Sequence, residues 1–97
     1  MGFRFTAPLW AWDGDAPWYF VTVPAEQSDD IRDRPRMPRG FGSVKVRVTV
    51  GGSTWDTSVF PDSKVGMYIL PVKKAVRVAE GLGEGDPVEV RLELLEL

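Results

Sequence analysis

The sequence contains no cysteine and no histidine. Without cysteine the chain can form no disulfide framework, no thiol nucleophile and no thiolate metal site, which suits a reducing cytoplasm. Without histidine, the common zinc sites, the Ser-His-Asp arrangement and the usual general base at neutral pH are excluded as well. We therefore expect a protein that is not an enzyme and that holds no metal and no cofactor.

Long hydrophobic runs and an excess of positive charge are also missing. Every uncharged stretch is far shorter than the roughly 20 apolar residues of a membrane helix, and the N-terminal residues lack the apolar region of a secretion signal. The 12 basic residues are outnumbered by 14 acidic residues, so the net charge is −2 and no positive field attracts nucleic acid or an anionic membrane. The sequence predicts a soluble, cytoplasmic protein with no membrane partner, and nucleic acid is a weak candidate.

What is present fits one small globular domain. Hydrophobic residues make up 43% of the 97 residues and charged residues 27%, as in ordinary soluble proteins. A chain of this length buries roughly 60 to 70% of its unfolded surface, which is enough for one hydrophobic core. We expect a single domain over residues 1–97.

Alternating apolar residues predict most of the secondary structure. Residues 3–9 and 18–23 are typical of two strands, which form a hairpin around a turn at residues 13–17. Residues 24–42 form a connection with one helical turn around residues 25–31. We interpret the arginines of this connection as residues of a solvated loop, namely Arg32, Arg34, Arg36 and Arg39.

The clearest hairpin spans residues 44–60. Gly51-Gly52 fits a two-residue primed turn, which fixes the register of the two strands. An opposite-charge cross-strand pair contributes roughly 0.2 to 1 kcal/mol and supports the register independently of the apolar face. The register predicts the pairs Val50/Ser53, Val48/Trp55, Val46/Thr57 and Val44/Val59 on one face and Arg47/Asp56 on the other.

The pattern of the C-terminal part of the sequence predicts a turn, a short strand, a helix and a last strand. The turn at residues 60–66 leads into a strand over residues 67–70, and Pro71 suits the first position of a helix over residues 72–80. Residues 88–94 alternate as a half-buried strand. The helix is expected to carry an apolar stripe made of Val72, Ala75, Val76 and Ala79. We expect it to end at Gly81 in a left-handed conformation, with Leu82 folding back over the end of the helix.

Short strands, hairpin turns and one short helix predict an all-β fold. An open sheet of this length would leave long unpaired edges. We therefore expect a small closed β-barrel of about six to seven strands, with the short helix capping one mouth. A β-sandwich is the alternative.

The motifs of the chain resemble a known bacterial family. The resemblance rests on the segments "GSVKVRVTVGGSTWDTSVFPD", "YILPVKKAVRVAEGLGEGDPVEVRLEL" and "FRFTAPLWAWDGDAPWYFVTVP". They are similar to the domain of unknown function number nineteen-hundred-and-five. The resemblance implies a small closed barrel with double-psi-like character and no established activity. Some relatives carry a following bacteriocin-protection, OmpD-associated segment, whereas this chain stops at Leu97, so we expect the barrel alone.

Three basic residues near the start of the predicted helix form the sharpest candidate site. Acids are favoured at a helix N-terminus, so Lys73 and Lys74 cost from a few tenths to about 1 kcal/mol unless an anion offsets the repulsion. With Arg77 one turn further on, they could cradle a carboxylate or a phosphate. The more common alternative is that all three are solvated, with Glu80 or an acid of a neighbouring strand as counter-charge.

Three tryptophans form a second candidate site. Trp10, Trp12 and Trp18 flank the first turn, and a hairpin would bring them near one another. They could form an aromatic surface on which a ligand, sugar or peptide stacks, whereas packing in the core or at the barrel end is the more common role. Turn formation is the role expected of four aspartates, Asp13, Asp15, Asp62 and Asp86.

These features rank the functions. We expect a non-catalytic binding or interaction module whose partner is an acidic small molecule or a protein. The alternative is a structural barrel that self-associates into a homo-oligomer through an exposed strand edge. An enzyme with Lys73 or Lys74 as nucleophile and a DNA-binding barrel rank below both.

Overall fold

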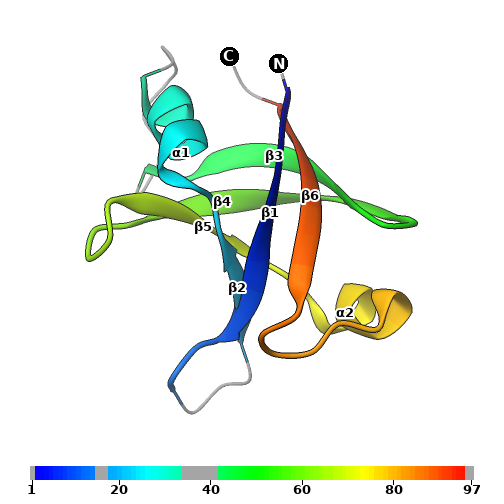
Figure 1. Ribbon diagram of the computed structural model, residues 1–97. Helices are drawn as coiled ribbons and strands as arrows, with labels where there is room; N and C mark the ends of the chain where they lie inside the picture. Colours follow the sequence, from blue (N-terminus) through cyan, green and yellow to red (C-terminus); the bar gives the residue numbers. More distant parts are fainter. Residues whose placement is uncertain (1, 15–17, 34–41, 96–97) are drawn as a thin grey trace.

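Six strands and two helices make up the part of the chain that the structure, a computed structural model, describes (Figure 1). The described residues are 2–14, 18–33 and 42–95. In chain order the elements are β1 (Gly2–Ala11), β2 (Tyr19–Thr22), α1 (Ala25–Arg32), β3 (Val44–Val50), β4 (Ser53–Asp62), β5 (Met67–Pro71), α2 (Lys74–Glu80) and β6 (Pro87–Leu94). The predicted all-β fold is confirmed.

The strands close into one barrel in the order β1-β2-β5-β4-β3-β6, and β6 returns to pair with β1. This confirms the predicted closed barrel, whose strand number lies within the predicted range. The sandwich alternative is wrong, because a single sheet wraps around one core. Every described strand pair is antiparallel. The double-psi-like character that the resemblance implies stays a prediction.

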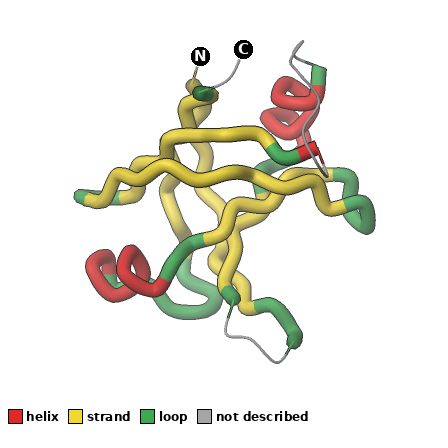
Figure 2. The backbone as a smooth tube through the Cα atoms, turned by 180° about the vertical axis from the view of Figure 1, so that it is seen from behind, coloured by secondary structure: helices red, strands yellow, loops and turns green. Residues whose placement is uncertain are grey.

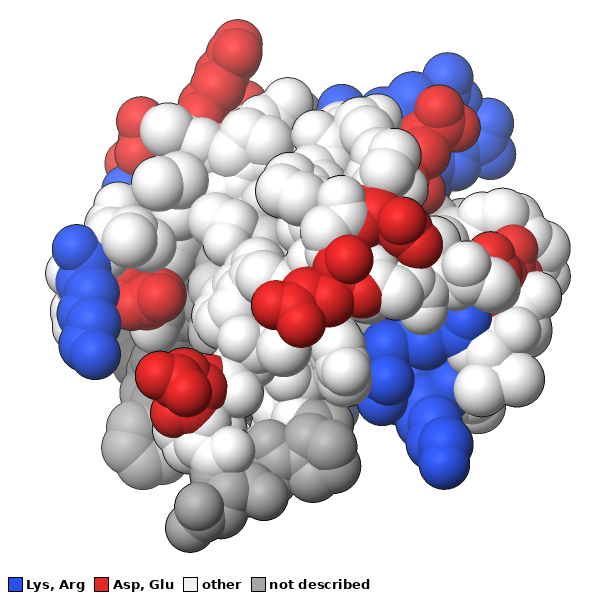
Figure 3. Space-filling view, turned by 60° about the horizontal axis from the view of Figure 1, so that its bottom comes forward, with Lys and Arg blue, Asp and Glu red and all other residues white. Residues whose placement is uncertain are grey.

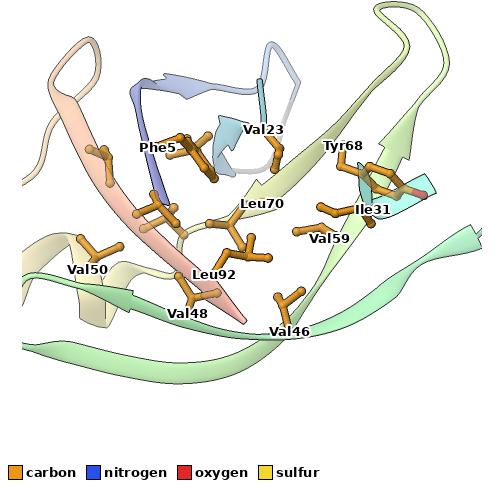
Figure 4. Close-up of a cluster of buried hydrophobic side chains, with 14 of the residues drawn as sticks. Phe5, Val23, Ile31, Val46, Val48, Val50, Val59, Tyr68, Leu70 and Leu92 are labelled. Atoms are coloured by element: carbon orange, nitrogen blue, oxygen red, sulfur yellow. The ribbon is translucent and has the colours of Figure 1, made fainter. Parts of the chain in front are cut away.

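The hydrophobic core lies inside the barrel (Figure 4). Successive side chains of a strand point to opposite faces, so alternation in the sequence becomes burial on one face. Phe5 and Leu9 of β1 and Leu70 of β5 are buried in this way. The two most regular buried rows come from β3 and β6, namely Val44, Val46, Val48 and Val50, and Val88, Val90, Leu92 and Leu94.

The β3–β4 hairpin has the predicted register. Gly51 has a φ of 56°, a left-handed value that glycine adopts without a steric cost and that a two-residue turn requires. On the outer face, Nε of Arg47 lies 2.9 Å from the carboxylate of Asp56. The five expected pairs are all confirmed, namely Val50↔Ser53, Val48↔Trp55, Val46↔Thr57, Val44↔Val59 and Arg47↔Asp56.

A second helix, which the sequence only partly predicts, covers one end of the barrel. α1 has eight residues where a single turn was expected, and its Ile31 is buried beside Tyr68 (Figure 4). The expectation of one capping helix is therefore wrong, because α1 and α2 lie at opposite ends of the barrel (Figures 1 and 2). Neither of the described helices has the length and apolar character needed to cross a membrane.

Ser28 holds α1 to the barrel. Its hydroxyl donates to the carbonyl oxygen of Val23 at 2.9 Å and accepts from the amide of Tyr68 at 3.0 Å. The amide of Val23 donates directly to the carbonyl of Tyr68 at 2.8 Å. The buried hydroxyl of Ser28 therefore bridges the amide of Tyr68 and the carbonyl of Val23, which would bond directly to each other in an uninterrupted β2–β5 ladder.

The beginning of the predicted second helix is strand and connection instead. Pro71 belongs to β5, where it pairs with Phe20, so it is not the first residue of a helix. The amide of Val72 donates to the carbonyl of Tyr19 in β2 at 3.0 Å. This bond keeps the chain beside β2, and α2 begins only at Lys74.

The apolar stripe expected on this helix is wrong in part. Ala75 and Ala79 are exposed, and the buried residue within α2 is Val76. The predicted end is confirmed, since Gly81 has a left-handed φ of 65° and Leu82 packs back against the core.

The predicted loops and turns have mixed outcomes. Asp62 and Asp86 are confirmed as turn formers, because their carboxylates accept from the backbone amides of Lys64 at 3.1 Å and Gly83 at 2.8 Å. Arg32 ends α1 and lies 2.8 Å from the carboxylate of Asp29. Four predicted loop or turn residues lie outside the described residues, namely Asp15, Arg34, Arg36 and Arg39.

Replacement of Ser28 by alanine should destabilise the fold. Ser28→Ala leaves the carbonyl of Val23 and the amide of Tyr68 buried without their partner, and an unsatisfied buried group costs about 1 to 3 kcal/mol. We expect the free energy of unfolding, measured by urea titration, to fall by about that amount. Ser63→Ala in the exposed β4–β5 turn is the matched control and should change it by less than about 0.5 kcal/mol. Equal stability of the two variants would contradict the bridging role.

Candidate functional site

A cleft opens at the end of the barrel that carries α2. It measures about 720 Å³ and lies between β2, β4 and the segment that leads from β5 into α2. On the face shown in Figure 3, acidic and basic side chains lie side by side in several places, and uncharged side chains cover much of the remaining surface. The cleft is lined by aromatic rings and by basic side chains, chiefly Trp18, Tyr19, Trp55, Phe60, Lys73, Lys74 and Arg77.

The strands position the aromatic part of the cleft. Trp55 shares the inner face of β4 with Val59, and its half-buried ring packs against the core. Tyr19, the first residue of β2, packs against the core in the same way. Phe60 lies on the opposite face of β4 from Val59 and is 40% exposed. The barrel wall therefore supplies the rings, whereas the β5–α2 connection and α2 supply the charges.

Arg77 is fixed by two contacts. Its guanidinium lies 3.9 Å from the centroid of the Tyr19 ring, and its Nε donates to the carbonyl of Val72 at 3.2 Å. A cation–π contact of this kind contributes roughly 0.5 to 1 kcal/mol at a partly exposed site. The stacked guanidinium keeps its charge and its terminal N–H donors.

Lys73 and Lys74 stand exposed at the start of α2. Glu80, one counter-charge that the sequence suggests for them, is turned away. Its carboxylate accepts from the hydroxyl of Ser53 at 2.7 Å and from the amide of Gly52 at 3.3 Å. Within the described part of the chain, no ion pair involves either lysine. The structure thus brings the three predicted basic residues to one cleft, and anion binding by them stays a prediction.

The acidic residue of the cleft is already paired. The carboxylate of Asp56 accepts from the guanidinium of Arg47 at 2.9 and 3.2 Å on the outer face of the β3–β4 hairpin. This hydrogen bond lowers the pKa of Asp56; desolvation opposes the effect, and the charges of Arg47 and Lys45 add to it. The same hydrogen bond raises the pKa of Arg47. With Asp56 paired in this way, positive charge dominates the cleft.

The three tryptophans lie on the outer surface of the barrel. Trp10 is half-buried, packs on Phe20 with a centroid distance of 5.1 Å and donates from Nε1 to the hydroxyl of Thr22 at 2.9 Å. Trp12 and Trp18 are 52% and 53% exposed, so the expectation of packing is wrong for both. Trp12, Trp18 and Phe20 line a second depression of about 340 Å³ beside the cleft. Ligand stacking on this aromatic surface stays a prediction.

A second group of basic residues is less suited to binding an anion than the basic residues of the cleft are. Arg4 and Arg91 lie opposite each other on β1 and β6 beside a shallow depression of about 400 Å³. Glu89 and Glu93 share the outer face of β6 with Arg91, and the carboxylate of Glu93 lies 3.9 Å from Arg47. Because acids alternate with arginines on this face, neighbouring charges compensate one another.

Comparison with known families identifies the domain. The chain matches the family described as Domain of unknown function (DUF1905) over residues 5–92. It belongs to this family. The match covers most of the chain and confirms the resemblance that its motifs indicate. A search of curated proteins found no match to the chain. The family description names no activity, so the function of this DUF1905 domain has to be inferred from its own residues.

The sequence does not reveal four further residues of the cleft. Tyr19, Trp55, Phe60 and Pro71 line it, yet each reads only as a strand, turn or helix residue in the sequence. A signal for Trp55 is present, because the predicted register puts this large residue on the inner face beside valines. The contact between Tyr19 and Arg77 has no such signal, since the two residues are far apart in the chain.

Stability of the DUF1905 domain should follow the ionisation of Asp56. Because the folded-state pKa of Asp56 is lowered, the ionised group stabilises the fold above its unfolded-state pKa. This contribution is lost as the pH falls through the folded-state pKa. We expect Asp56→Asn to lower the urea midpoint near pH 7, and we expect its difference from the native protein to disappear as the pH falls and the carboxyl group of Asp56 becomes neutral.

The control for this experiment is Glu84→Gln in the exposed turn after α2, which should follow the native protein at every pH. A difference between Asp56→Asn and the native protein that persists at low pH would show that the Arg47–Asp56 pair is not its cause.

Proposed function

We propose that this protein is a non-catalytic binding module whose cleft takes a ligand with an anionic group and an apolar or aromatic body. One observation carries the proposal. A single cleft of about 720 Å³ holds both an aromatic wall and basic side chains that no acid of the described chain neutralises. Small-molecule sites commonly combine apolar walls with a few convergent polar groups.

Each part of the cleft matches one part of such a ligand. Trp55 and Tyr19 offer ring surface to a flat apolar group. Lys73 and Lys74 can pair with a carboxylate or a phosphate, and Arg77, held against Tyr19, presents planar donors to the same group. The proposed ligand is therefore amphipathic and acidic.

The same residues favour binding over catalysis. Asp56 is held by Arg47, so this carboxylate is not placed to act as a general base within the cleft. A lysine nucleophile is normally activated by desolvation or by a neighbouring cation in an apolar pocket, whereas Lys73 and Lys74 are exposed. These features support a role in recognition.

Self-association is the second candidate function. It is favoured by the part of β4 that pairs with β3 alone, because an exposed strand edge is a template for a second chain. The charge beside that edge opposes self-association, since two copies would bring Lys73 and Lys74 of each copy together. Light scattering on a size-exclusion column separates the two functions, and a monomer supports the binding module.

Calorimetric titration with matched naphthalene probes tests the proposed function. 2-Naphthoate and 1-naphthyl phosphate present a carboxylate and a phosphate on the same flat body, and neutral 2-naphthamide lacks the charge. We expect both anions to bind at least about tenfold more tightly than the amide at low salt, which corresponds to about 1.4 kcal/mol. Their binding should weaken as salt screens the lysines. Equal affinity for the acid and the amide would contradict the proposal.

Two charge-matched variants locate the site. Lys73→Glu/Lys74→Glu should weaken naphthoate binding at least about tenfold, because it reverses the charge at the cleft. Lys64→Glu/Arg91→Glu changes the net charge by the same amount at exposed positions outside the cleft and should stay within about twofold of the native protein. An equal loss in both variants would show that net charge, and not this cleft, governs binding.

A further inference from the structure

The barrel wall is interrupted beside the cleft. β4 pairs with β3 along residues 53–59 but with β5 only along residues 60–62. In the described ranges, residues 54–58 of β4 therefore have no strand partner on the β5 side. Figure 2 shows the chain after β5 turning away from β4 toward α2.

Pro71 explains the interruption. Continuing the β4–β5 register by two residues would place Ser58 opposite Pro71. Proline has no amide hydrogen to donate, so this pair cannot form both of its hydrogen bonds. The next residue, Val72, donates its amide to Tyr19 of β2, which carries the chain away from β4.

The backbone groups that face the gap follow from the alternation of the ladder. The carbonyl of Lys45 accepts from the residue after β6 at 3.0 Å, so Lys45 turns toward β6 and its neighbour Val46 turns toward β4. Val46 pairs with Thr57, whose amide and carbonyl therefore face β3. Backbone groups of successive residues in a strand point to opposite sides. The amides and carbonyls of Asp56 and Ser58, on either side of Thr57, therefore point away from β3 and face the gap.

The gap and the cleft are the same opening. Asp56 and Thr57 line the cleft on one side, and Pro71 and Val72 line it on the other. Lys73 continues the second side. A ligand in the cleft therefore meets backbone donors and acceptors of a strand as well as rings and lysines.

We propose that the cleft takes an extended acidic peptide, which adds as a strand to the free edge of β4. The peptide backbone bonds to Asp56 and Ser58. Alternate side chains of the peptide point to opposite faces, so acidic residues reach Lys73 and Lys74 while the residues between them pack on Trp55. The inference rests on the proposed function, because it names the ligand class of the same cleft.

Charge selects this partner over a second copy of the chain. Edge-to-edge pairing of two copies would place two sets of Lys73 and Lys74 beside one another, and like charges at an interface are unfavourable. An acidic peptide supplies the opposite charge. Because the carboxylate of Asp56 is paired with Arg47, its negative charge does little to weaken the attraction between the lysines of the cleft and the acidic peptide.

The probe is the alternating peptide acetyl-Glu-Val-Glu-Val-Glu-Val-amide, with acetyl-Lys-Val-Lys-Val-Lys-Val-amide as the charge control. We expect the acidic peptide to bind the native protein and to lose at least about tenfold in affinity against Lys73→Glu/Lys74→Glu. Bound peptide should slow amide exchange at Asp56 and Ser58 at least about tenfold, while Trp55 and Thr57, already bonded to β3, change by less than about twofold. The basic peptide should not bind.

N-methylated peptides test the strand pairing itself. Methylating every second amide blocks one edge of the peptide, so of the two possible sets one should lose at least about tenfold in affinity and the other less than about twofold. Equal behaviour of the two sets, whether both bind or both fail, overturns strand addition.

The remaining outcomes separate this inference from the proposed function. Binding of 2-naphthoate without binding of the acidic peptide overturns the peptide and leaves the anion cleft. Failure of both probes removes both proposals. Protection of Asp56 and Ser58 that rises with protein concentration alone, together with a dimer in light scattering, overturns the peptide in favour of a second copy.

Discussion

Closure of the barrel depends on β5, a strand of five residues that bonds to β2 on one side and to β4 on the other. A barrel removes the edges of a sheet only where every neighbouring pair is complete. At one end of β5, the hydroxyl of Ser28 completes the ladder to β2 and ties α1 to the barrel. At the other end, Pro71 has no amide to offer β4, so the wall opens and the cleft forms there.

How much of the fold could be predicted follows from which interactions are local. The β3–β4 register is confirmed because a two-residue turn, a row of valines and the Arg47–Asp56 pair all fix it within one short segment. Pro71 suits a strand edge and a first helical turn equally well by local rules, and its pairing with Phe20, far away in the chain, decides between them. Ser28 reads as an ordinary helix residue until β2 and β5 are placed around it.

The candidate site divides in the same way. Lys73 and Lys74 stand out in the sequence because basic residues are unfavourable at the start of a helix. Their suggested counter-charge, Glu80, binds the β3–β4 turn instead, which no local pattern reveals. The rings are hidden for the same reason, since the contact of Arg77 with Tyr19 exists only once β2 lies beside the chain entering α2. Sequence thus indicates the charges of the cleft, and the tertiary fold supplies its walls.

Amide hydrogen exchange along β4 of the free protein, followed by NMR, tests the open edge most directly. We expect an alternating pattern of protection along β4. Trp55 and Thr57, whose amides face β3, should exchange at least about a hundredfold more slowly than Asp56 and Ser58, whose amides face the gap. If Asp56 and Ser58 are instead as protected as their neighbours, the edge of β4 is closed in the free protein, which would contradict an open barrel wall beside the cleft.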